Sequence, residues 1–83
     1  MKQLILYSKP NCNYCTKAKA FLKENQIDYT EINVMEDAAS LAKIKEDGHR
    51  TLPVLYADDK PLIRGGYDTL KTMRREEILE RLR

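Results

Sequence analysis

Apolar and polar residues change their spacing several times along this chain, and each change marks an expected element. Residues 3–8 are short, apolar and followed by Lys-Pro-Asn, which predicts a buried strand. Residues 14–25 then take a helical spacing, because Ala18, Phe21 and Leu22 fall on one face and lysines fall elsewhere. The chain therefore begins with a strand, a short loop and an amphipathic helix.

The middle of the chain continues this alternation of strands and helices. Residues 28–33 alternate and predict a second strand, and residues 36–48 are rich in helix formers and end at Gly48, a C-terminal cap. Residues 53–58 predict a third strand that starts on Pro53, a position where proline is tolerated. A turn at residues 58–60 and a fourth strand over residues 61–64 complete a hairpin.

The last segment, residues 68–82, is helical in composition but does not keep one phase. Leu70 and Met73 suit one face, whereas Ile78 and Leu82 suit a face that has slipped. We therefore expect a break between residues 72 and 76, with a short helix before it and a longer one after it. The order β-α-β-α-β-β-α predicts an α/β fold with a right-handed crossover and a four-stranded mixed sheet flanked by helices. We expect one domain, residues 1–83.

Composition excludes several function classes. Hydrophobic residues make up 42% and charged residues 34% of the chain, as in ordinary globular proteins. The net charge is only +2, and the basic residues near the C-terminus alternate with glutamates, so we expect no nucleic-acid binding. No segment approaches the roughly 20 apolar residues of a membrane span, and the first residues do not resemble a signal peptide. We expect a cytoplasmic protein with no membrane partner.

The two cysteines, Cys12 and Cys15, carry the candidate chemistry. A structural disulfide of this span would close a very small loop and stabilise little. A zinc site needs four ligands, and His49 is the only histidine, so we expect no metal site. The third interpretation is a reactive dithiol, because the pair stands between a strand and a helix.

The helix position suggests different tasks for the two thiols. Unpaired amides and the helix dipole at an N-terminus favour an anion and lower the pKa of a thiol there. We expect Cys12 to be exposed and nucleophilic, and Cys15, one turn further, to be more buried and to act as the resolving thiol. Lys9 adds positive potential near the Cys12 thiolate.

Three motifs resemble the glutaredoxin family, and they are spread over nearly the whole chain. Lys-Pro-Asn-Cys-Asn-Tyr-Cys at residues 9–15 resembles the family's K-P-x-C-P-Y-C active site. Thr-Leu-Pro at residues 51–53 resembles its T-V-P motif, and Gly-Gly-Tyr-Asp at residues 65–68 resembles its Gly-Gly-aromatic motif. The resemblance implies a thioredoxin/glutaredoxin fold and a glutathione-dependent thiol-disulfide oxidoreductase. Its substrates would be protein disulfides and glutathione mixed disulfides.

The resemblance also implies roles for individual residues. Cys12 would attack the disulfide and Cys15 would resolve the intermediate. Pro53 would be cis, which would turn the backbone N–H and C=O of Leu52 toward the cleft, where they pair with substrate like a strand. The residues implied to bind glutathione or substrate are Lys9, Tyr14, Arg50, Thr51, Leu52, Pro53, Gly65, Gly66, Tyr67 and Asp68.

The two ends of glutathione would meet different parts of this set. Gly66, Tyr67 and Asp68 would hold the γ-glutamyl end, with backbone amides for its carboxylate and the Asp68 carboxylate for its ammonium. Lys9, with Arg50 beside it, would approach the glycyl carboxylate. Asp68 is also a candidate N-cap, and the two glycines also suit a tight helix entry.

Asn13 departs from the family pattern, which has proline at this position. Asparagine restores an N–H and loosens the turn. As hypotheses, the N–H stabilises a Cys12 thiolate, the redox potential moves, or a flexible turn favours a glutathione-ligated [2Fe–2S] cluster between two monomers. Otherwise we expect a monomer with glutathione as its co-substrate.

Two other functions stay open. Some small glutaredoxin-like proteins take electrons from thioredoxin reductase and serve ribonucleotide reductase, and this chain is short for the family. The double glycine and Lys9 favour glutathione instead. The third function is a non-catalytic or Fe–S-binding module of the same fold, which the intact Cys12, Cys15 and Pro53 disfavour.

Overall fold

The computed structural model of the chain describes residues 1–83. The elements are β1 (Leu4–Ser8), α1 (Asn13–Glu24), β2 (Thr30–Asn33), α2 (Ala38–Glu46), β3 (Val54–Ala57), β4 (Lys60–Pro61), α3 (Tyr67–Leu70) and α4 (Arg75–Arg81). The strands form one sheet in the order β2-β1-β3-β4. β1 pairs parallel with β2, and the other two pairings are antiparallel. The predicted mixed four-stranded sheet and βαβ unit are therefore confirmed.

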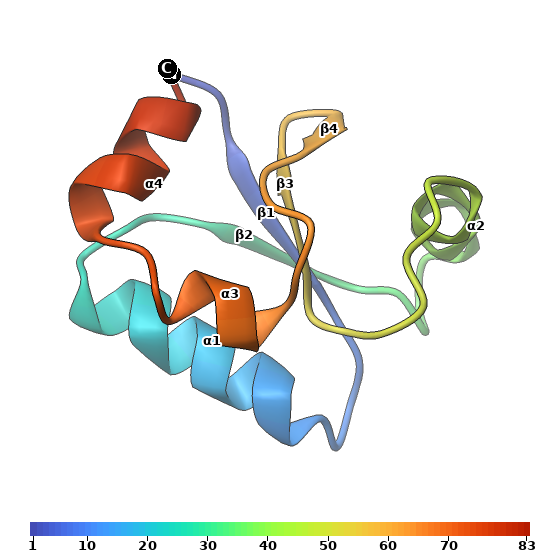
Figure 1. The fold of residues 1–83 in the computed structure, drawn as a ribbon. Coiled ribbons are helices and arrows are strands. Elements are labelled where there is room, and N and C mark those ends of the chain that lie inside the picture. The colour runs from blue at the N-terminus through green and yellow to red at the C-terminus, as the bar shows by residue number, and fades with distance from the viewer.

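Helices cover both faces of the sheet, because side chains of a strand alternate between the two faces (Figure 1). Leu4 and Leu6 of β1 join a cluster that takes in residues of α1, α3 and α4. Tyr7 of β1 joins the other cluster, in which Ile44 of α2 packs against β3 residues. The sheet thus has α1, α3 and α4 on one side and α2 on the other.

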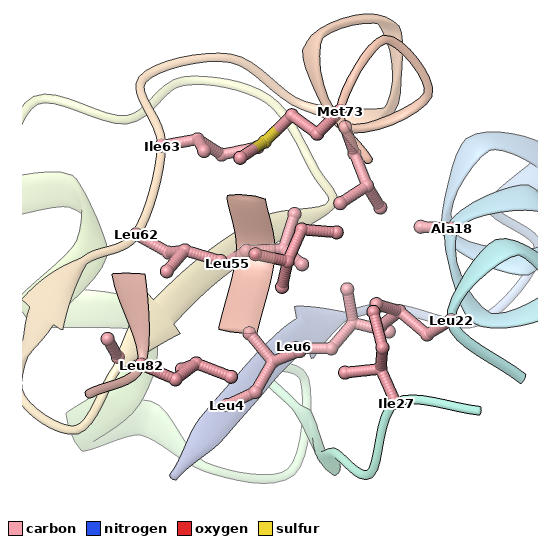
Figure 2. Packing of buried hydrophobic residues seen from close by; sticks show 13 residues of the cluster. Leu4, Leu6, Ala18, Leu22, Ile27, Leu55, Leu62, Ile63, Met73 and Leu82 are labelled. Atoms are coloured by element: carbon pink, nitrogen blue, oxygen red, sulfur yellow. The ribbon is translucent and has the colours of Figure 1, made fainter. Parts of the chain in front are cut away.

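The larger cluster fixes the position of α1 on the sheet. Figure 2 shows Ala18 and Leu22 of α1 directed toward Leu6 of β1. Cys15, Ala18 and Leu22 are the buried residues of this helix, at 1%, 0% and 0% exposure. Their spacing of three and four residues makes one stripe, so the stripe that packs the core also holds Cys15 beneath the surface.

The boundaries of two strands differ from the prediction. The fourth strand was expected over residues 61–64, but β4 ends at Pro61, and Leu62 and Ile63 join the core at 5% exposure each. The second strand begins at Thr30 instead of residue 28, because the residues that follow α1 still form the turn at its C-terminus. Gln26 has a φ of 55°, and the Ile27 N–H donates to Leu22 O at 2.9 Å.

The expected caps and breaks of the helices are largely confirmed. Gly48, with φ 93°, follows α2, and the N–H of His49 donates to Ile44 O at 3.0 Å. The C-terminal segment breaks where its phase slips, between the end of α3 at Leu70 and the start of α4 at Arg75. The side chain between them that stays in the core is Met73.

Candidate active site

Cys12 and Cys15 form a disulfide at the N-terminus of α1. Cys12 is the N-cap, and its Sγ accepts a hydrogen bond from the Cys15 N–H at 3.2 Å. Cys12 is half-buried, whereas Cys15 is 1% exposed, so the predicted difference in burial is confirmed. When the pair is reduced, a thiolate at Cys12 would keep this donor and the positive end of the helix dipole. No acidic residue in the first turn opposes that charge.

The Leu52–Pro53 peptide bond is cis, as the resemblance implied. The carbonyl oxygen of Leu52 lies 4.0 Å from Cys12 Sγ. The Leu52 N–H forms no backbone hydrogen bond within the chain. A peptide beside Cys12 could therefore pair with this backbone as an added strand does.

An open cleft of about 920 Å³ begins at Cys12 and extends to α2. Five of the predicted binding residues line it, namely Lys9, Tyr14, Arg50, Thr51 and Leu52. Its charged side chains are Lys9, Lys45 and Arg50, and no carboxylate is among its lining residues. A wall of one sign raises the local concentration of ligands of the opposite sign, so the cleft suits an anionic peptide.

The sequence did not reveal the α2 wall of this cleft. Leu41, Ile44 and Lys45 belong to no motif, and residues 36–48 were expected only to form a helix. The signal that could have found them is their spacing, because residues three and four apart share one face of a helix. His49 also lines the cleft, and its ring lies 5.8 Å from that of Tyr56.

The two glycines have different neighbours: Gly66 lies against Pro53 and Gly65 lies against Thr69. A Cβ atom at Gly66 would lie 3.3 Å from Pro53 O and 3.8 Å from Pro53 Cδ, and one at Gly65 would overlap Thr69 Oγ1. Gly66 of this motif therefore lies beside the cis-proline of the site. It does not line the cleft beside α2.

Tyr67 and Asp68 form the first turn of α3. The Tyr67 ring is 6.3 Å from the ring of Tyr14, which connects this helix to the active-site segment. The expectation that Asp68 is an N-cap is wrong, because α3 starts at Tyr67 and its N-cap is Gly66, two residues before Asp68. The Asp68 side chain is 78% exposed and lies 3.6 Å from Lys71 Nζ.

A second group of polar side chains, which the sequence did not reveal, lies beneath the start of α1. The Ser8 hydroxyl donates to Glu31 Oε2 at 2.7 Å, and Lys19 Nζ lies 3.1 Å from the same oxygen. The hydrogen bond from Ser8 lowers the pKa of the Glu31 carboxyl, and Lys19 acts in the same direction. Glu31 directly precedes the apolar Ile32 on β2, and a charged residue in such a position is expected to face solvent.

No three or more His, Cys, Asp or Glu side chains gather as a metal-binding group in this structure. None of its helices is long and apolar enough to cross a membrane.

Comparison with known proteins points to the same chemistry. The glutaredoxin family model matches residues 4–62. Glutaredoxin 1 of Rickettsia conorii is 35% identical over 83 residues, which covers 95% of this chain and 78% of the relative. The chain belongs to the glutaredoxin family. It is therefore a thiol-disulfide oxidoreductase of this family, and its Cys-x-x-Cys pair, Cys12 and Cys15, forms a disulfide.

This glutaredoxin is also similar to proteins with other names. Glutaredoxin-like protein NrdH of Lactococcus lactis is 41% identical over 54 residues, or 65% of this chain and 75% of the relative. Global transcriptional regulator Spx 1 of Bacillus cereus is 51% identical over 41 residues, or 49% of this chain, but the chain spans only 31% of that relative's length. The buckwheat glutaredoxin–glutathione complex is 26% identical with a TM-score of 0.74 and covers 98% of this chain and 76% of that chain.

Proposed function

We propose that this glutaredoxin uses glutathione to reduce protein disulfides and glutathione mixed disulfides. The observation that carries the proposal is the cleft beside Cys12, which combines the half-buried Cys12 sulfur, the cations Lys9 and Arg50, and the backbone of Leu52. Glutathione is a small anionic peptide that carries a thiol. The cleft therefore offers a sulfur for its thiol, cations for a carboxylate and backbone groups for its peptide bonds.

The Cys12 thiolate attacks one sulfur of the substrate disulfide. A mixed disulfide forms, and the other substrate sulfur leaves as a thiolate that takes a proton from water. The Cys15 thiolate then attacks Cys12 Sγ, which releases the second substrate thiol and leaves the Cys12–Cys15 disulfide. Two glutathione molecules restore the dithiol and become glutathione disulfide. A glutathione mixed disulfide needs only Cys12, because a second glutathione can release it.

The binding residues divide between the two ends of glutathione. Lys9 and Arg50 take the glycyl carboxylate at the cleft, where no protein carboxylate competes with it. Gly66 and Asp68 take the γ-glutamyl end, and Gly66 reaches the site through its contact with Pro53. Tyr14 packs beside the bound peptide, because its ring is 52% exposed next to Cys12.

A second candidate function is electron transfer from thioredoxin reductase to ribonucleotide reductase. The similarity to NrdH of Lactococcus lactis favours it. The cations Lys9 and Arg50 and the double glycine favour glutathione, since a reductase that docks as a whole protein needs no peptide-sized anion site.

We also propose that the 83 residues act as one domain and as a monomer in the cytoplasm. A dithiol that turns over needs a compartment that keeps supplying reducing equivalents. A [2Fe–2S] cluster would need ligands from outside the chain, because Cys15 lies within the core stripe and Cys12 alone is accessible.

A coupled assay with glutathione, glutathione reductase and NADPH tests the proposal. The substrate is a peptide glutathionylated on one cysteine. Wild type and Cys15→Ser should both reduce it, whereas Cys12→Ser should lose all activity above the uncatalysed rate. Retention of activity by Cys12→Ser would contradict the assignment of the nucleophile.

A further inference from the structure

A smaller pocket, of about 420 Å³, lies on the sheet side of the active-site loop. Both cysteines line it, and so do Ser8, Lys19 and Glu31. The reduction mechanism described above uses Cys12 from the cleft and gives none of these three polar residues a task. They nevertheless line the same pocket as Cys15, which is only 1% exposed.

Three elements bring these side chains together. In β1, Ser8 follows Leu4 and Leu6 at alternate positions, so it lies on the face that α1 covers. In β2, Ile32 packs on the opposite face, which places its neighbour Glu31 on the α1 side. Lys19 is one turn beyond Cys15 on α1, and residues four apart are neighbours on a helix.

Ser8 occupies a central position in this group. It is the only polar residue of the chain that is buried, at 2% exposure. Its hydroxyl donates to Glu31 Oε2 at 2.7 Å. A hydroxyl keeps two acceptor lone pairs while it donates, so Ser8 Oγ can also accept a proton. Lys19 contacts the same Oε2, and the other carboxylate oxygen of Glu31, Oε1, forms no hydrogen bond or ion pair within the chain.

Cys15 needs such a group during turnover. Only a thiolate attacks a disulfide, and burial in apolar surroundings disfavours the thiolate form. Cys15 shares its helix stripe with Ala18 and Leu22, and solvent hardly reaches it. The proton must therefore leave through the protein or wait for an opening of α1.

We propose that Ser8 and Glu31 form the route by which the Cys15 proton leaves. The thiol proton passes to Ser8 Oγ while the hydroxyl proton of Ser8 passes to Glu31 Oε2. The Cys15 thiolate then forms the bond to Cys12 Sγ, and the substrate sulfur leaves with the electrons of the broken disulfide. That thiolate takes a proton from water, and Glu31 later gives its proton back to water, so the proton balance closes. The proposal rests on the dithiol mechanism above.

The charges around Glu31 keep its carboxyl group ionised. The charged groups that face it are the cations Lys19 and Lys23 of α1, and Lys9 of the active-site loop lines the same pocket. The Ser8 hydrogen bond, Lys19 and Lys23 lower the pKa of the Glu31 carboxyl, so it is ionised throughout the neutral range. Lys19 is a positioning residue, because it holds the carboxylate beside Ser8.

The rate of closure of the Cys12–Cys15 disulfide tests the route directly. Reduced protein is mixed with excess bis(2-hydroxyethyl) disulfide and quenched with acid, and the mixed and internal disulfides are separated by mass, between pH 5.5 and 9. We expect Glu31→Gln to slow closure at least fivefold at pH 7 and to make the rate climb more steeply with pH. Ser8→Ala should act in the same direction. The matched control, Glu24→Gln, removes an exposed charge from α1 and should stay within twofold of wild type.

Formation of the mixed disulfide at Cys12, measured in a Cys15→Ser background, should not change with Glu31→Gln. A slowing of closure below fivefold, an acceleration, or a slowing without a change in the pH profile would overturn the proposal. Acceleration would show that the Lys19 cation alone controls Cys15. The probe contains no glutathione, so the result stands apart from whether glutathione is the physiological reductant.

Discussion

Gly65 is the position at which the structure predicts the clearest effect of one added methyl group. A Cβ at Gly65 would overlap Thr69 Oγ1 and would lie 2.7 Å from Thr69 Cβ. A Cβ at Gly66 would lie 3.3 Å from Pro53 O, a tight contact that a shift of a few tenths of an ångström relieves. We therefore expect Gly65→Ala to destabilise the fold far more than Gly66→Ala.

The magnitude follows from two opposed effects. Forcing a methyl group into filled space costs about 1–3 kcal/mol. Glycine to alanine stabilises by about 0.4–1 kcal/mol through the unfolded chain where the native backbone permits alanine. The glycine with positive φ is Gly48, so this gain is applied at Gly65. The net loss of unfolding free energy should be about 1–2 kcal/mol for Gly65→Ala and about 0.5 kcal/mol or less for Gly66→Ala.

Urea denaturation followed by circular dichroism measures the difference. With a slope of about 1 kcal/mol per molar urea for a small domain, the midpoint of Gly65→Ala should fall by about 1–2 M. Adding Thr69→Ala removes the overlapping hydroxyl and should recover part of the loss. If Gly65→Ala unfolds at the wild-type urea concentration, the reasoning is refuted. That result would show that α3 and the residues before it can shift without a loss of unfolding free energy.

Three further predictions concern charge and titration. Burial and the hydrogen bond from the Tyr56 hydroxyl to Asp47 raise the pKa of Tyr56. The stability that this group contributes should therefore be complete below pH 10 and should fall as the pH rises further. Urea denaturation at each pH should show a less steep fall in Tyr56→Phe. The lowered pKa of Glu31 has the opposite sign: its contribution is present above its ordinary pKa of 4.5 and is lost as pH falls, so Glu31→Gln should flatten the acid limb of the same melts. Lys9→Gln should raise the KM for a glutathionylated peptide roughly threefold or more with little change in kcat, as expected when a residue binds the ground state and the transition state equally strongly. Lys60→Gln on β4 should change neither constant.

The sheet and its crossover could be predicted because the spacing of apolar residues is clear in each strand and helix. The break before α4 was also predictable, since Ile78 and Leu82 cannot share a face with Met73 in one straight helix. The end of β4 was not predictable. The apolar residues Leu62 and Ile63 suit a strand and a core-facing loop equally, and packing against the α1 side of the sheet decides between them.

The site divides in the same way. Residues carried by a local motif, such as Cys12, Cys15 and Pro53, could be chosen from the sequence alone. The Ser8–Glu31 contact joins residues 23 positions apart and depends on the parallel register of β1 with β2, which no short motif records. The α2 wall of the cleft was missed for the same reason.

Asn13 is the departure from the family pattern, and the structure limits what it changes. Asn13 is the first residue of α1, a position where proline is common and where the N–H has no partner within the helix. The fold therefore accepts either residue, so any effect of Asn13 falls on the chemistry of Cys12. Asn13→Pro is the variant that isolates this effect.

A comparison of electron donors tests the central claim most directly. The same disulfide substrate is reduced by wild type and by Asn13→Pro, once with glutathione and glutathione reductase and once with thioredoxin reductase, each supplied with NADPH. We predict turnover with glutathione for both proteins and a rate at least tenfold lower with thioredoxin reductase. Faster turnover with thioredoxin reductase would contradict the glutathione cleft at Cys12 and would favour the NrdH-like function.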